Sequence, residues 1–170
     1  MDSSVIRCFF PDDARRSWAD FKSSAPRNPE ELASCSEVIL GHFTSSTFFE
    51  SIDRDGLVPD IKKERAVEDD LPSDLTSVYL AATFDRFYLK RAVKNHGGAG
   101  LIVVVRVDIR SLLADDASLK PADLGLSSKQ QLYLSLQFGS CKHRGPIERS
   151  RVIGFYDECG QNWNKRITSS

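Results

Sequence analysis

Residues 100–113, with the sequence GLIVVVRVDIRSLL, form the strongest strand pattern in the chain and constrain its fold most. The run from Leu101 to Val105 is apolar, uninterrupted and rich in β-branched residues, before Val107 and Ile109 alternate with polar side chains. Such a run suits a central strand that is buried on both faces of its sheet. We therefore expect one hydrophobic core around this strand, in a chain whose 170 residues fit a single domain.

Shorter apolar patterns surround this strand. Further strands are predicted over 37–44, over 77–83 and twice within 140–158, on either side of a Pro turn. Helices are predicted over 11–24, 45–56 and 84–98, the last two with glycines as stop signals. Residues 131–139 fit a short helix or a strand equally well. Because strands outnumber helices and the helices come early, the order predicts an α+β fold with antiparallel or mixed sheets.

Composition divides the chain into an N-terminal helical extension, residues 1–36, and a main domain, residues 37–170. Residues 25–36 contain two prolines and are predicted to be a connector. Residues 58–76 are polar and charged without an apolar period, which predicts a long loop. Structureless connections of this length are uncommon in compact domains and tend to be lids or binding loops. Two interpretations stay open for this loop, a binding element and an inert insertion.

Charge and cysteine content narrow the classes of partner and site. With 23 basic and 24 acidic side chains the formal net charge is −1, so no long-range field draws the whole protein onto nucleic acid or membrane. The four cysteines lie far apart without a C-x-x-C pair, which predicts reduced thiols, and no metal ligand is assigned. No secretory signal or membrane-spanning apolar segment is present in the sequence. We therefore expect a soluble, cytoplasmic protein.

Gly41-His42-Phe43-Thr44 closes the predicted strand 37–44 with two polar side chains. Side chains alternate along a strand, so His42 and Thr44 point to one face at the entrance of helix 45–56. A strand end of this kind can hold a ligand, and it is also an ordinary way to finish a strand. Tyr79, in the predicted strand SVYLAAT, has the same two interpretations, a ligand-binding ring or a half-buried strand residue.

The order of these segments resembles the ADP-ribosyltransferase superfamily, on the histidine–tyrosine branch that includes diphtheria-like toxins and poly-ADP-ribose polymerases. Bacterial DNA ADP-ribosyltransferases and RNA 2'-phosphotransferases are similar in the same places. The resemblance covers residues 37–156 and rests on LGHFTSSTFFESIDRDGLVP, SVYLAAT and GSCKHRGPIERSRVIGF. It implies split antiparallel or mixed β-sheets with flanking helices, and NAD as a substrate.

The resemblance implies a role for each residue of the first two motifs. His42 would hydrogen-bond a ribose hydroxyl of NAD, and Thr44 would hold the same ribose. The backbone of Phe43, where the family often has glycine, would contact the nicotinamide amide. The ring of Tyr79 would stack on the nicotinamide, for which an aromatic face is the physical requirement. The loop 58–76 would then lie over the dinucleotide.

The catalytic acid is the point at which this sequence departs from the family pattern. Active members commonly place a glutamate at the start of a late strand, where its charge stabilises the cationic ribose that forms as nicotinamide leaves. This chain offers Gln137, which has no charge, before SCKHRGPI, and Glu148 after the Pro turn. Both stay open as the catalytic group beside His42 and Tyr79.

RNA 2'-phosphotransferases suggest a second function, because they use the same fold with basic residues in place of the acid. The matching region here carries Lys142, His143, Arg144, Arg149 and Arg151. Arginine can clamp a phosphate through two parallel hydrogen bonds, which makes Arg144 a further candidate for cofactor binding. The N-terminal helical module of that family, with its Arg-His signature, is not found in this sequence. A solvated charged edge is the other interpretation of the cluster.

The function we expect is that of a toxin-like mono-ADP-ribosyltransferase, which uses NAD to modify a protein or a nucleic acid and releases nicotinamide. Two alternatives stay open. The first is a module that binds NAD, an ADP-ribose-like ligand or a partner protein without turnover. The second is an enzyme similar to RNA 2'-phosphotransferases. The three differ in whether a carboxylate or a basic cluster reaches the ribose.

Overall fold

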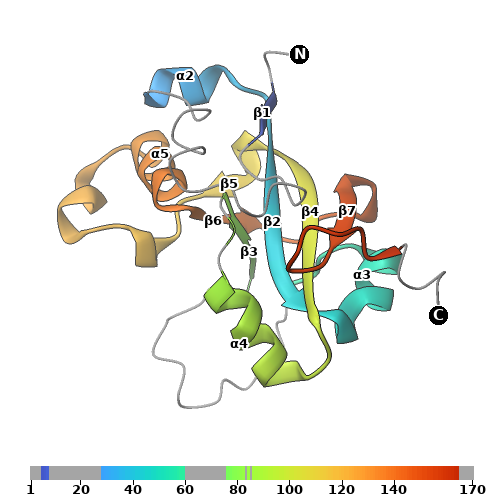
Figure 1. Ribbon diagram of the computed structural model, residues 1–170. Coiled ribbons are helices and arrows are strands. Elements are labelled where there is room, and N and C mark those ends of the chain that lie inside the picture. Colours follow the sequence, from blue (N-terminus) through green and yellow to red (C-terminus); the bar gives the residue numbers. More distant parts are fainter. Residues whose placement is uncertain (1–4, 8–27, 60–75, 83, 85, 165–170) are drawn as a thin grey trace.

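The computed structural model describes residues 5–7, 28–59, 76–82, 84 and 86–164, which form an α+β fold (Figure 1). The strands are β1 (Val5–Arg7), β2 (Glu37–Ser45), β3 (Ser77–Ala81), β4 (Gly100–Asp108), β5 (Leu112–Leu113), β6 (Ser140–Arg144) and β7 (Val152–Tyr156). The α-helices are α2 (Pro29–Ser34), α3 (Phe49–Asp55), α4 (Arg86–His96) and α5 (Ser128–Phe138). Short 3-10 helices are η2 (Ser46–Phe48), η3 (Ile109–Ser111), η4 (Asp116–Ser118), η5 (Pro121–Gly125) and η6 (Arg149–Arg151). The helix predicted over 11–24 and most of the loop 58–76 lie outside the described residues.

The strands form one sheet that is antiparallel except at β1. Its order is β5-β6-β3-β2-β4-β7, and β1 pairs in parallel with β2. The predicted α+β class with an antiparallel or mixed sheet is therefore confirmed. Strand β4 pairs with β2 along its whole length and with β7 on its other edge. Residues Leu101 to Val105 are all buried, which confirms that this strand is central and covered on both faces.

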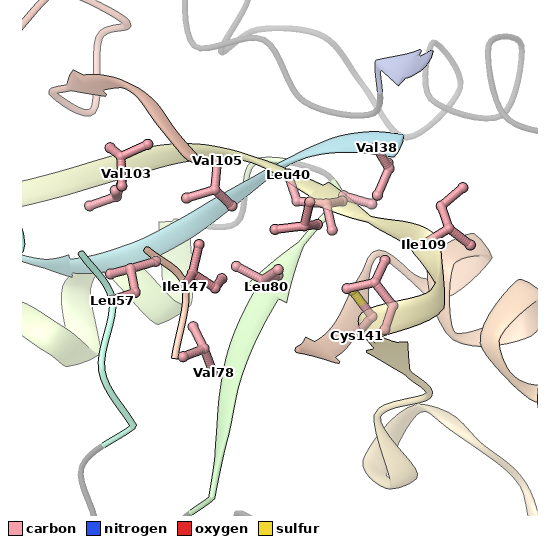
Figure 2. Packing of buried hydrophobic residues seen from close by; sticks show 14 of the residues in the cluster. Val38, Leu40, Leu57, Val78, Leu80, Val103, Val105, Ile109, Cys141 and Ile147 are labelled. Carbon is pink, nitrogen blue, oxygen red and sulfur yellow. The ribbon is translucent and has the colours of Figure 1, made fainter. Parts of the chain in front are cut away.

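Alternation along β2 and β4 divides the buried side chains between two clusters. Val38 and Leu40 face Val103 and Val105 in the main core, which β3 closes with Leu80 (Figure 2). Ile39, Ile102 and Val104 point to the opposite face and pack under Leu89 of α4. Helix α4 thus covers one face of the sheet near the ends of β2 and β3 (Figure 1).

The connector predicted over 25–36 is wrong in part, because Pro29–Ser34 is helix α2. Its start carries the usual signals: the Asn28 side chain accepts a hydrogen bond from the Glu31 backbone N–H at 2.8 Å, and Pro29 occupies the first turn. Leu32 is only 2 % exposed and belongs to the main core, and α2 packs against α5. The described parts of residues 1–36 are therefore built into the sheet and core of the rest of the chain.

Local capping explains where the other helices begin and end. Ser45 caps η2, which leads directly into α3, and Gly56 ends α3 with φ at +81°. The ambiguous stretch 131–139 belongs to helix α5, because Ser127 and Gln130 form a capping box at its start and Gly139 ends it in a left-handed conformation. Within the described residues, no helix is long and apolar enough to cross a membrane.

Candidate functional site

Strands β2 and β3 separate just where the first motif begins. Their register contains one pair, Gly41 opposite Ala81. Beyond it, β2 continues against β4 and β3 continues against β6. The side chain of His42 spans the opening, with Nδ1 2.9 Å from the backbone oxygen of Tyr79. An imidazole therefore bridges the two strands next to their one paired position.

The bond to Tyr79 fixes the protonation of His42. A backbone carbonyl only accepts, so Nδ1 must carry a proton and donate it. Burial lowers the pKa of His42 below the usual 6.5, and this effect outweighs the hydrogen bond to Tyr79, which raises it. The ring is therefore neutral at pH 7, and its Nε2 is a hydrogen-bond acceptor. Such an atom suits a ligand that donates a hydroxyl.

Two hollows share His42, Phe43 and Tyr79 as walls. The first, which we call the Asp115 hollow, has a volume of about 270 Å³ and is lined further by Gly41, Leu80, Ala81, Tyr88, Arg91, Asp115, Ala117 and Ser140. The second, the Gly56 hollow, has a volume of about 560 Å³. It extends over α3, the turn at Gly56 and one side of α4. Because the three shared residues border both, a ligand that fills both hollows passes over His42 and Tyr79.

The residues of the first two motifs are brought together by the fold. His42, Phe43 and Tyr79 line both hollows, and Thr44 lines the Gly56 hollow. Thr44 is 7 % exposed and lies on the same strand face as His42, as the alternation predicts. The ring of Phe43 packs edge-on against Phe84 at 5.7 Å between centroids, so the cluster under α4 holds this side chain in place.

The other three predicted site residues lie elsewhere. Gln137 is in the last turn of α5 and not at the start of a strand. Glu148 is exposed before η6, where the Ser150 hydroxyl donates to its Oε2 at 3.3 Å. Arg144 is exposed at the end of β6, opposite Ser77 in the sheet register. Neither hollow is lined by any of these three residues.

Asp115 is a carboxylate that the sequence reasoning missed. It precedes η4, in a polar stretch that follows β5, and it is 9 % exposed. It lines the same hollow as His42 and Tyr79. The only sequence signal was the pair Asp115-Asp116 after an apolar segment, which is also the ordinary signal of a helix cap. Its place beside β3 depends on the long-range pairing of β5, β6 and β3.

Hydrogen bonds hold Asp115 in a fixed position. Its backbone N–H donates to the buried Ser135 hydroxyl at 2.8 Å, and that hydroxyl donates to the Ser140 backbone oxygen at 2.6 Å. Its Oδ1 accepts from the Ala117 backbone N–H at 3.2 Å. Within the described part of the chain, Oδ2 accepts no hydrogen bond and is not shut off from solvent. One oxygen is thus fixed and the other is available to a ligand.

The charge of Asp115 also acts on its buried neighbour in β6. Burial raises the pKa of the Cys141 thiol, and the nearby Asp115 carboxylate raises it further. Cys141 is therefore protonated and inert at neutral pH. Lys142, which is also buried, pairs instead with the exposed Asp116, with Nζ 2.8 Å from Oδ2. The carboxylate of Asp115 is not used in that ion pair.

The basic cluster of residues 142–151 is largely engaged with the protein itself. Arg149 bonds the Asp53 carboxylate at 2.6 Å and also the Asp53 backbone, and Arg151 bonds Glu37 at 2.6 Å. The Nδ1 atom of His143 lies 3.2 Å from the Gly145 backbone oxygen. These contacts favour a structural role for the cluster. The one arginine that lines the Asp115 hollow is Arg91 of α4, a residue for which the sequence alone suggested no role.

Acidification provides a test of the state of His42. The unfolded chain binds a proton at His42 near pH 6.5 and the folded chain only at lower pH, so the free energy of unfolding falls as pH drops through 6.5. The titration of His42 can change the free energy of unfolding by at most about 1.4 kcal/mol per pH unit. We expect His42→Asn to lack this pH dependence of stability. Its amide can still donate a hydrogen bond to the Tyr79 oxygen. Urea unfolding of both proteins at about pH 7.5 and about pH 5.5 measures the difference. An equal fall in the free energy of unfolding of wild type and His42→Asn would show that folding does not lower the pKa of His42. The two proteins have every other histidine in common.

Comparison with known proteins adds no relative. The chain matches no protein-family model, and no curated protein is similar to it in sequence. Among the residues that the structure describes, no group of three or more His, Cys, Asp and Glu side chains is placed to hold a metal ion.

Proposed function

We propose that the protein binds NAD across the two hollows and transfers its ADP-ribose group to a macromolecule, with release of nicotinamide. One observation carries the proposal. A neutral histidine acceptor, a tyrosine ring and an accessible carboxylate line one hollow, at the point where β2 and β3 separate. The resemblance of the His42, Thr44 and Tyr79 motifs to ADP-ribosyltransferases supports the same function.

The dimensions and chemistry of the hollows suit a dinucleotide. Pockets for small molecules and cofactors commonly measure about 300–1,000 Å³, and the Gly56 hollow has a volume of about 560 Å³. His42 Nε2 would accept a hydrogen bond from a ribose hydroxyl, and the Thr44 hydroxyl is on the same strand face. The Tyr79 ring offers a flat apolar face to the nicotinamide.

The reaction breaks the bond between the ribose C1' and the nicotinamide nitrogen. Nicotinamide leaves as a neutral molecule with the bonding electron pair, and positive charge develops on the ribose. A lone pair of the acceptor then forms the new bond to C1', and the acceptor releases a proton to water. The Asp115 carboxylate would lie against the developing charge, where a fixed negative group in a partly dry site stabilises the transition state. In this proposal Asp115 takes the role for which the sequence offered Gln137 and Glu148.

The test is calorimetric titration of the full chain with NAD, with nicotinamide release followed on the same sample. We expect binding with slow release. We expect His42→Asn to weaken NAD binding about tenfold, because it removes the Nε2 acceptor and keeps a donor to Tyr79. His143→Asn is the matched control, since His143 also bonds a backbone oxygen through Nδ1 but lines neither hollow.

The possible results separate the three functions. Binding without nicotinamide release would favour a module that recognises NAD without turnover. Absence of NAD binding, or equal binding by wild type and His42→Asn, would overturn the proposal. Phosphate transfer from RNA has little support, because Arg149, Arg151 and Lys142 are engaged with Asp53, Glu37 and Asp116.

A further inference from the structure

Helix α4 carries a basic stripe on its outer side. The helix contains Arg86, Lys90, Arg91 and Lys94 and no acidic residue. Arg86, Lys90 and Lys94 recur at four-residue spacing, so they stand in one row over about 12 Å of helix. All three are exposed. Because the whole chain has a net charge of −1, the row is a local concentration of positive charge and not part of a general excess.

Phe87 lies beside this row, and Tyr88 lies next to Phe87 on the side of the Asp115 hollow. Phe87 is 62 % exposed and Tyr88 is 43 % exposed, with their ring centroids 5.6 Å apart. The helix already has an inner face, because Leu89 is 2 % exposed and packs on the sheet under α4. Leu89 therefore attaches α4 to the sheet, and both rings remain partly exposed. Exposed apolar side chains that stand together, and not singly, can form a binding surface.

The same helix forms a wall of the candidate site. Tyr88 and Arg91 line the Asp115 hollow, and Ala92 and His96 line the Gly56 hollow. Figure 1 shows α4 beside the ends of β2 and β3, where those strands separate. A macromolecule lying on the outer face of α4 would therefore be next to the ribose that His42 binds.

The positive charges of the row are weakly compensated by the described residues. Arg86 lies 3.5 Å from Glu158, and the two side chains are 62 % and 51 % exposed. An ion pair this exposed contributes little free energy and is screened by salt. Lys90 and Lys94 make no ion pair with the described residues. The row can therefore attract an external polyanion.

We infer that the macromolecular acceptor is a single-stranded nucleic acid, held by Arg86, Lys90 and Lys94 through its phosphates and by Phe87 and Tyr88 through its bases. Single strands expose both negative charge and flat rings, and proteins that bind them combine basic grooves with aromatic side chains. A duplex hides its ring faces, and an acidic peptide offers charge without rings to stack. The inference rests on the proposed function for the reaction, but the binding itself needs no NAD.

The test is fluorescence anisotropy of the full chain with labelled single strands of about 15 nucleotides of mixed sequence. DNA, RNA, duplex DNA and a poly-glutamate peptide are compared between about 50 and about 200 mM salt. We expect a single strand to bind best. The logarithm of its association constant should fall linearly with the logarithm of the salt concentration, with a slope of about −0.7 for each phosphate contact. We expect the triple change Arg86→Gln, Lys90→Gln and Lys94→Gln to weaken binding at least tenfold and to make the slope shallower by about 2.

A second variant and a control make the result specific to α4. Phe87→Leu with Tyr88→Leu should weaken single-strand binding about tenfold and leave the salt slope unchanged, because stacking carries no net charge. Arg110→Gln, Lys120→Gln and Lys129→Gln remove the same number of exposed charges elsewhere and should change little. NAD titration of the α4 triple variant should match wild type.

Three outcomes would overturn the inference. They are no single-strand binding, equal losses in the α4 and control variants, or preference for the duplex or the acidic peptide. Each can occur while NAD still binds and releases nicotinamide, in which case the proposed function stands and only the acceptor is wrong. Loss of NAD binding in wild type would instead overturn the proposed function and leave the α4 surface to be judged by the anisotropy alone.

Discussion

Replacing Asp115 by asparagine is expected to lower nicotinamide release from NAD about a hundredfold while NAD affinity stays within about threefold of wild type. A unit charge about 5 Å from another contributes roughly 3 kcal/mol at the effective dielectric constant of about 20 that suits protein sites, and this corresponds to about a hundredfold in rate. The charge on the ribose is largest in the transition state, so the loss should fall on turnover and not on binding.

Asparagine is the sharpest change at this position because it preserves the structure around it. Its side-chain oxygen can still accept from the Ala117 N–H, and the backbone bond to Ser135 is unaffected. Turnover and NAD affinity of Asp115→Asn would be measured together with Glu148→Gln, which removes an exposed carboxylate outside both hollows. Glu148→Gln should behave as wild type. A large loss in Glu148→Gln, or a gain in Gln137→Glu, would move the acid back to a position offered by the sequence.

The second large effect concerns Gly56, and it is an effect on stability. Gly56 has φ +81° and ψ −160°, a region that only glycine populates freely, at a cost of roughly 1–3 kcal/mol for other residues. A Cβ there would lie 2.1 Å from the Ile147 backbone oxygen and 2.7 Å from the Arg149 backbone nitrogen. Overpacking against backbone adds roughly another 1–3 kcal/mol. We expect Gly56→Ala to lower the free energy of unfolding by about 3 kcal/mol or more, as measured by urea denaturation.

Gly56→Ala should also disturb the candidate site, because its steric clash lies where two segments far apart in sequence pair with each other. Leu57 and Ile147 exchange two backbone hydrogen bonds, of 2.9 and 2.8 Å, directly beside Gly56. Both side chains belong to the main core (Figure 2). Gly56 and Leu57 also line the second hollow. Folded Gly56→Ala should therefore bind NAD more weakly than wild type.

Two other glycines separate backbone strain from collision. Gly145 has φ +72° with nothing within 4 Å of its added Cβ, so Gly145→Ala tests the conformational cost alone. We expect about 1 kcal/mol for it. Gly125 has neither a positive φ nor a close neighbour, and Gly125→Ala should be close to neutral. A Gly56→Ala loss no larger than that of Gly145→Ala would contradict the collision with Ile147 and Arg149.

Much of the secondary structure could be predicted because its signals are local. The apolar, β-branched run after Gly100 favours a buried strand, and the Ser45 and Gly56 signals bound the helical segment between them. Residues 131–139 can be assigned to a helix only through the caps at Ser127 and Gly139, because their apolar period is weak. The two prolines of residues 25–36 favour a connector and so conceal helix α2, although Asn28 and Pro29 are ordinary start signals of a helix.

The sequence by itself determined which residues form the strands and helices around His42, Thr44 and Tyr79, because periodicity and capping depend on neighbours in the chain. The tertiary structure alone decided that β2 and β3 separate at Gly41, that Asp115 and not Gln137 or Glu148 lines the opening, and that Phe87 and Tyr88 of α4 face outward. These outcomes depend on strand order and on which helix face meets the sheet. Both are set by the packing of segments far apart in sequence, which no local pattern encodes.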